Sequence, residues 1–180
     1  PKKTDEKELG LLMTGSIRDL TINKTKMTSL IASGKATTTG HLLRHEIVEW
    51  VRGTDQSVDV MGRGYMPFDA KSDGLASYRY SIIIENVREH GYFTEKLIDA
   101  ILCETVPIYW GCPDIADFFD TTSMILCDGA HDIKAAVASA SEDDYQARLA
   151  GLRVLKKQAD SFTDHEVRLA KALRQEIAQG

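Results

Sequence analysis

The chain has 180 residues, 43% of them hydrophobic and 27% charged, which is typical of one globular domain with its own core. No apolar run is long enough to span a membrane, and the charged N-terminus contains no signal-peptide core. The formal net charge of −5 argues against a nucleic-acid partner, because binding to a phosphate backbone needs a positive field. Cys103, Cys112 and Cys127 lack CxxC spacing and predict reduced, mostly buried thiols, with neither a disulfide framework nor a zinc site.

Residues 1–25 form a lead-in for which the pattern leaves two structures open. A short helix capped near Thr4 is one, and a strand from Leu9 to Ile17 is the other. The chain starts with Pro1 and not with a methionine, so we expect it to be a piece of a longer protein. Residues 26–180 are predicted to form one domain that is closed by helices at its C-terminal end.

Within that domain, strands are predicted to alternate with helices. The strands are expected at residues 26–33, 58–61, 79–84, 106–110 and 123–127. The helices are expected at residues 41–51, 95–102, 131–140, 142–159 and 164–178, with a short helix just before the central strand. This order predicts an α/β fold, a doubly wound Rossmann-like parallel sheet.

The stretch from Tyr78 to Phe119 packs its polar residues into two loops, each of which follows a strand. Loops at the carboxyl ends of parallel strands meet at one edge of the sheet, and that edge is where ligands bind in such folds. We therefore expect a ligand site at this edge. The side chains expected there are Glu85, Asn86, Tyr92, Glu95, Lys96, Tyr109 and Trp110.

Gly91 to Lys96 is the most informative segment of this stretch. A glycine turn that leads into a helix offers free backbone N–H groups and a positive dipole end to an anion. Lys96 adds a full positive charge, and Glu95 is a carboxylate suited to a pair of ribose hydroxyls. An ordinary solvated Glu–Lys pair remains the alternative. Neither a GxxxxGK[ST] loop nor a GxGxxG loop occurs in the chain.

Other candidates each have a simpler structural explanation. Glu85 and Asn86 end an apolar strand, so they lie either on the surface or in a cleft. Arg44 suits a bidentate phosphate contact, but most arginines on helices are simply solvated. Arg63, between two glycines, is either a ligand contact or a surface turn residue. His41 and His45 share a helix face, but without a third ligand they are interpreted as surface histidines and no metal site is expected.

The residues ENVREHGYFTEKLIDAILCETVPIYWGCPDIADFF resemble the donor-binding signature of the α1,3/α1,4-fucosyltransferases, glycosyltransferase family 10. The signature appears as IEN, GYFTEK and VPIYWGCP, with Ile84 where the family usually has Phe. The segments KMTSLIASG and VDVMGRG resemble the family more weakly, and Gly34 stands where the family has Asn. The resemblance covers Lys26 to Phe119 and implies the C-terminal, Rossmann-like half of a GT-B enzyme that binds GDP-fucose.

The resemblance also implies a role for each matching residue. Glu95 would bind the ribose hydroxyls, Lys96 and Arg44 would neutralise the diphosphate, and Glu85 would face the fucose. The residues expected to line the nucleotide and sugar site are Asn86, Gly91, Tyr92, Thr94, Glu95, Lys96, Arg44 and Arg63. The catalytic assignments are Lys96, Arg44 and Glu85, and neither a cofactor nor an essential divalent metal is expected.

The implied reaction is an inverting transfer of fucose from GDP-fucose to a glycan hydroxyl, and the absence of a Glu-x7-Glu pair favours inversion. The general base is expected from an acceptor-binding domain, in a longer chain or a partner. A non-catalytic nucleotide-sugar module and a GT-B transferase for another donor remain alternatives. A bacterial protein is expected in the cytoplasm or peripheral to the membrane, and a eukaryotic one in the Golgi lumen.

Overall fold

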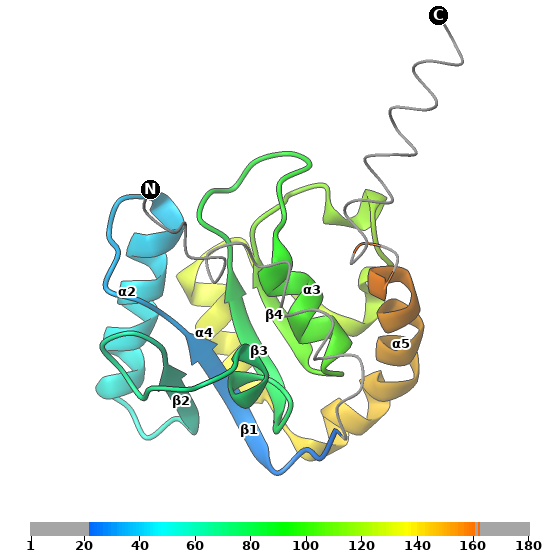
Figure 1. Cartoon of the computed structure of the whole chain (residues 1–180), viewed down its shortest axis with the longest axis horizontal. Coiled ribbons are helices and arrows are strands. Elements are labelled where there is room, and N and C mark those ends of the chain that lie inside the picture. The colour runs from blue at the N-terminus through cyan, green and yellow to red at the C-terminus, as the bar shows by residue number, and fades with distance from the viewer. Residues whose placement is uncertain (1–21, 161, 163–180) are drawn as a thin grey trace, which may run out of the picture.

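The computed structural model describes residues 22–160 and 162, and it contains a single five-stranded sheet (Figure 1). The strands are β1 (Lys26–Ile31), β2 (Val58–Met61), β3 (Tyr78–Ile84), β4 (Val106–Trp110) and β5 (Ile125–Leu126). Their order is β2-β1-β3-β4-β5, and every neighbouring pair is parallel. The predicted doubly wound parallel sheet is confirmed, in the 2-1-3-4-5 variant of that fold.

Helices cover both faces of the sheet (Figure 1). The helices are α2 (Thr39–Arg52), α3 (Glu95–Leu102), α4 (Ala130–Ser139) and α5 (Glu142–Asp160), joined by the 3-10 turns η3 (Lys71–Gly74), η4 (Ile115–Asp117) and η5 (Thr121–Ser123). Helices α2 and α4 pack together on one face, and α3 and α5 pack together on the other. Right-handed crossovers explain why α2 and α3 lie on opposite faces, because the chain leaves β1 toward one edge and leaves β3 toward the other.

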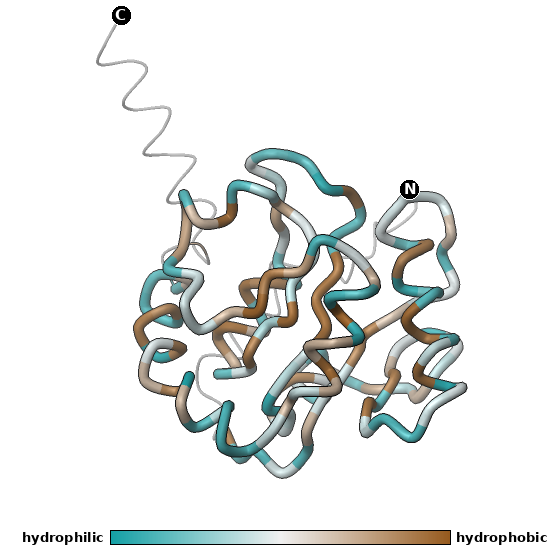
Figure 2. The backbone as a smooth tube through the Cα atoms, turned by 180° about the vertical axis from the view of Figure 1, so that it is seen from behind, coloured by the Kyte–Doolittle hydropathy of each residue, from teal (hydrophilic) through white to brown (hydrophobic). Residues whose placement is uncertain are grey.

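The hydrophobic core lies between these layers, and Figure 2 shows apolar residues along the central strands. Strands buried on both faces are expected to be continuous apolar runs, and β4 and the Ile82–Ile84 end of β3 fit this description. The largest fully buried side chains are Tyr78, Tyr80, Tyr109, Leu30, Ile47, Leu75, Ile82, Ile84, Leu97, Ile101 and Leu102. The three cysteines are free and buried, as predicted.

Several predicted boundaries need correction. Strand β1 ends at Ile31, two residues earlier than expected, and β5 is reduced to two residues because η5 occupies the segment before it. The helix predicted at 164–178 and the lead-in at 1–21 lie outside the described residues. Within the described part of the chain, no helix is long and apolar enough to cross a membrane.

The connection from β2 to β3 passes over β1 and reaches β3 through η3, the short helix predicted before the central strand. The strand order changes direction between β1 and β3. In folds of this kind the crevice at such a switch point, outside the carboxyl ends of the strands, is the usual ligand site.

Candidate functional site

Helix α2 begins against the carboxyl end of β3. The backbone N–H of Gly40 donates to the carbonyl of Asn86 over 2.9 Å. A Cβ atom at this position would lie 1.7 Å from the carbonyl oxygen of Glu85, so the close approach requires glycine. The start of α2 and the loop after β3 are thereby joined at the switch point.

Glu85 is fully buried at the end of β3, and its carboxylate is held by the start of α3. Its Oε1 accepts from the backbone N–H of Thr94 over 2.9 Å, and its Oε2 accepts from the Thr94 hydroxyl over 2.8 Å. The ammonium of Lys96 lies 3.4 Å from the same Oε2 and 2.9 Å from the Thr94 Oγ1. A buried carboxylate at a helix N-terminus is stabilised by the helix dipole as well as by these partners.

This network corrects two expectations. The α3 N-terminus was expected to offer free N–H groups to an anion, but the N–H of Thr94 is bound to Glu85 and that of Lys96 to the Thr94 hydroxyl, which caps the helix. The N–H of Gly91, whose φ is positive, donates to Asp114 Oδ1 over 2.9 Å. Glu85 has no exposed surface, so its expected contact with fucose is not supported. Positive charge for an anion must come mainly from side chains.

Arg44 is buried on α2 and braces the end of β3. Its Nε and Nη2 donate to the carbonyl of Ile84 over 3.2 and 2.8 Å, and Nη2 also donates to Asn86 Oδ1 over 2.7 Å. Burial lowers the pKa of this guanidinium, although the Glu85 charge partly offsets the effect. Arg44 therefore orients Asn86, and of its three nitrogens only Nη1 makes no hydrogen bond within the described residues.

Glu95 belongs to a second ionic group on the α3 side of the switch point. Its Oε1 lies 3.3 Å from the ammonium of Lys71, in η3, and 3.8 Å from that of Lys96. The Lys71 ammonium is also 3.3 Å from Oδ2 of Asp99, a side chain that is 1% exposed. Burial alone would raise the pKa of Glu95, but Lys96 and Lys71 outweigh it and hold the pKa below its usual range. Burial raises the pKa of Asp99 to about 6.

These groups border a cavity of about 120 Å³ between η3 and α3. Its floor consists of isoleucines of β1 and β3, and its polar rim is formed by Lys71, Glu95, Lys96 and Asp99. Tyr109 and Trp110, which were expected at this edge, are instead core residues, both less than 10% exposed. The Trp110 indole N–H donates to the carbonyl of Asp128 and is not presented to a ligand.

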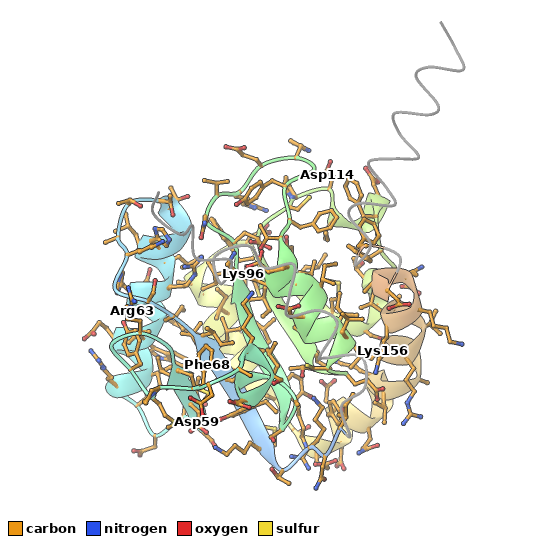
Figure 3. All side chains as sticks on the ribbon, viewed as in Figure 1. Asp59, Arg63, Phe68, Lys96, Asp114 and Lys156 are labelled. Atoms are coloured by element: carbon orange, nitrogen blue, oxygen red, sulfur yellow. The ribbon has the colours of Figure 1, made fainter. Side chains whose placement is uncertain are left out.

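Two further residues singled out in the sequence, His41 and Arg63, can be compared with the structure. His41 was interpreted as a surface residue, but it is 6% exposed because α2 begins against β3, and the prediction is wrong. Burial, followed by the charges of Arg44 and Lys35, lowers its pKa. Within residues 22–160 no group of three potential metal ligands occurs. Arg63 is exposed on the loop after β2, away from Lys96 (Figure 3), and makes no hydrogen bond or ion pair with the described residues.

Three residues of this region were not predicted as site residues from the sequence: Lys71, Asp99 and Gly40. Asp99 carries a signal, because it is a single carboxylate among the apolar residues of a buried helix. Lys71 carries none, since its position depends on how the crossover passes over β1. Among the predicted residues, the structure joins Glu85, Thr94, Glu95 and Lys96 in one network and Arg44 with Asn86 beside it.

Comparison with known proteins identifies relatives over most of this domain. The model for glycosyltransferase family 10 (fucosyltransferase) C-term matches residues 21–141. An alpha-(1,3)-fucosyltransferase of Helicobacter pylori is 41% identical over 64 residues, 36% of this chain and 13% of that protein. An alpha-(1,4)-fucosyltransferase of Arabidopsis thaliana is 34% identical over 58 residues, 32% of this chain and 14% of that protein.

Solved structures agree with this similarity. A crystal structure of an alpha1,3-fucosyltransferase superposes with a TM-score of 0.55 at 26% identity, covering 71% of this chain and 38% of that one. An alpha1,3-fucosyltransferase solved with GDP superposes with a TM-score of 0.57 at 21% identity, covering 83% and 45%, and shows a shared fold. The chain thus spans less than half the length of these relatives. It belongs to glycosyltransferase family 10, the fucosyltransferases, and corresponds to the C-terminal region of that family.

Proposed function

We propose that this chain is the donor-binding part of an inverting fucosyltransferase, which binds GDP-fucose at the switch point between β1 and β3. The observation that carries the proposal is the position of Lys96. Its ammonium is held at the carboxyl edge of the sheet by Glu85 and Thr94, while its side chain stays 30% exposed. A fixed cation beside open space is suited to a diphosphate, and the family membership makes GDP-fucose the donor to test.

In the proposed complex, Lys96 and the free Nη1 of Arg44 contact the diphosphate. Glu95 accepts hydrogen bonds from the ribose hydroxyls, and Asn86 and Tyr92 line the site. Glu85 keeps Lys96 and Thr94 in place without touching the donor. Arg63 and Gly91, which were expected to contact the nucleotide, are given no role, because Arg63 is remote and Gly91 is bound to Asp114.

The proposed reaction is a direct displacement at the anomeric carbon of fucose. The acceptor oxygen forms a bond to this carbon while the bond to the GDP oxygen breaks, and GDP leaves with the bonding electrons. The acceptor proton passes to a carboxylate of an acceptor-binding domain. Lys96 and Arg44 stabilise the negative charge that grows on GDP, and preorganised charges of this kind are typically worth a few kcal/mol.

Isothermal titration calorimetry of the chain with GDP, GDP-fucose and UDP tests donor binding. We expect GDP and GDP-fucose to bind and UDP to bind at least about tenfold more weakly, because guanine and uracil offer different hydrogen-bonding groups and the family membership points to a guanosine donor. Equal binding of all three, or binding of none, would contradict the proposal. Tighter binding of another nucleotide sugar would support a GT-B transferase with a different donor.

The Lys96→Ala variant tests whether Lys96 contacts the diphosphate. Loss of a charge-assisted contact should weaken GDP binding by about 1–3 kcal/mol, roughly 5- to 150-fold. Lys134→Ala is the matched control, since Lys134 pairs with Glu46 on the opposite face of the sheet. Because Lys96→Ala also removes a partner of the buried Glu85, the Lys96→Arg variant is compared in parallel. Unchanged GDP affinity in Lys96→Ala would remove Lys96 from the donor site.

A further inference from the structure

Lys71 lies outside the sequence segment that carries the family signature, yet it reaches the same site. It begins η3, on the connection that crosses over β1, and its ammonium lies between two carboxylates of α3. The distances to Glu95 Oε1 and to Asp99 Oδ2 are both 3.3 Å. Among the described residues, it is the member of η3 that makes polar contacts with α3.

The two carboxylates that Lys71 contacts differ in how far they are exposed to solvent. Asp99 is 1% exposed, four residues after Glu95 on the same helix, and is fixed in position by the core. Its Oδ1 is buried without a hydrogen-bond partner, so Lys71 is its countercharge. Glu95, by contrast, has a side chain that is 36% exposed. Asp99 thus anchors the ammonium from the buried side, and Glu95 meets it from the solvent side.

This arrangement leaves one oxygen of Glu95 available. Oε1 faces Lys71 and Lys96, whereas Oε2 makes no hydrogen bond to any other described residue; the backbone N–H of Glu95 itself also faces the carboxylate. A glutamate at the start of a helix has several rotatable bonds, and ordering it on binding would reduce affinity. Two cations fixed on one oxygen restrict that freedom before the ligand arrives and hold the other oxygen in one orientation.

We propose that Lys71, anchored by Asp99, is a positioning residue that holds the Glu95 carboxylate in the orientation in which it accepts hydrogen bonds from the ribose hydroxyls of the donor. The proposal rests on the proposed function, because it requires a nucleotide at this site. Lys71, in the segment between β2 and β3, would thereby help the site to select ribonucleotides. The aliphatic chain of Lys71 also borders the cavity between η3 and α3.

The experiment compares two probes, GDP and 2′,3′-dideoxy-GDP, by calorimetry on the full chain. The unaltered protein should prefer GDP by about tenfold or more, because only GDP offers the hydroxyl pair to a charged acceptor. In Lys71→Met, GDP should bind about 5- to 20-fold more weakly while the dideoxy probe binds as before, so the preference collapses. Methionine keeps an apolar chain beside the cavity. Lys134→Met, on the opposite face, should leave the preference intact.

The other possible outcomes separate a failure of the positioning role of Lys71 from a failure of the proposed donor site. Equal weakening of both probes in Lys71→Met, or an unchanged preference, would overturn the positioning role and leave the donor site standing. Absence of GDP binding in the unaltered chain would overturn the proposed function and this proposal with it. If Lys71→Met fails to fold by circular dichroism, Lys71→Arg takes its place; it should retain most of the preference. Asp99→Asn should reduce the preference without abolishing it, because Lys71 then loses its anchor.

Discussion

Glu85 ends a run of isoleucines, and burying a carboxylate there would be costly without partners. The structure supplies the Thr94 N–H, the Thr94 hydroxyl and the Lys96 ammonium, all from the first turn of the next helix or its cap. One buried side chain thereby fixes where α3 begins relative to β3. It also holds the Lys96 ammonium, the cation that we assign to the diphosphate. Glu85 would therefore affect ligand binding without contacting the ligand.

Asp99 supports a prediction about pH. Burial raises its pKa to about 6, opposed mainly by Lys71, with Glu95 and Lys96 as the other charges facing it. Between about pH 4 and pH 6, Asp99 therefore stays protonated in the folded state while it is ionised in the unfolded state. As pH rises from about 4 to 6, the ionised Asp99 lowers the free energy of unfolding, by on the order of 2–3 kcal/mol. Above pH 6 this loss is complete.

The Asp99→Asn variant should lack this dependence. Urea denaturation at pH 4.5 and pH 7.5 should therefore show a variant-minus-parent stability difference that becomes more favourable to the variant at the higher pH. Asp117→Asn, at an exposed position in η4, is the control for the loss of a carboxylate outside this ionic group. A stability difference in Asp99→Asn that does not change with pH, or that changes only as it does in Asp117→Asn, would contradict the raised pKa of Asp99.

At the scale of elements, the site depends on the contact between α2 and the end of β3. Gly40 allows this contact, and Arg44, one turn further along α2, completes it by binding Ile84 and Asn86. Two helices on opposite faces of the sheet thus meet one loop. A backbone hydrogen bond and the Arg44 side chain hold the start of α2, whereas the Glu85 carboxylate holds the start of α3.

The Gly40→Ala variant tests this dependence. Its Cβ would overlap the carbonyl oxygen of Glu85 at 1.7 Å, so α2 must move away from β3. We expect the free energy of unfolding to fall by about 2–3 kcal/mol, as for an overpacked site, and GDP binding to weaken with it. Gly34→Ala is the control, because nothing lies within 4 Å of its added Cβ. Equal stability of the two variants in urea would show that the contact is not tight.

The sequence predicted elements best where packing and periodicity agree. Strands β3 and β4 and helix α3 were found within one residue of the expected positions, because buried runs and the Thr94 cap define them. The pairing of Glu85 with Lys96 was not predicted, although both residues were. Lys71 and the burial of His41 depend on segments far apart in sequence, a crossover and a helix start, which no local pattern encodes.

At the scale of the whole molecule, the donor site that we propose would serve one half of a reaction. It contains the cations that we assign to the diphosphate and the carboxylate that we assign to the ribose, while the proposed general base is expected from an acceptor-binding domain. The chain spans less than half the length of the solved fucosyltransferases that it resembles.

Assays of fucose transfer should reflect this division. We expect the chain alone to bind GDP-fucose but to form no fucosylated product above background, because our proposal assigns the general base to an acceptor-binding domain. Chromatography of a panel of glycan acceptors incubated with GDP-fucose would measure the product. Transfer at a rate typical of enzymes, about 1 per second or faster, would show that the chain carries its own base.

The loop between Glu85 and Thr94 is suited to redesign, because its two ends are held together. Its two ends are joined by two hydrogen bonds from Thr94 to Glu85, so residues 86–93 form a closed segment on a fixed base. Because doubling the length of a loop adds only about 0.6 kcal/mol of closure entropy, the segment should accept insertions while the base keeps its geometry. A library that varies residues 87–90 in length and composition could therefore explore new sugar or acceptor preferences without rebuilding the nucleotide site beneath it.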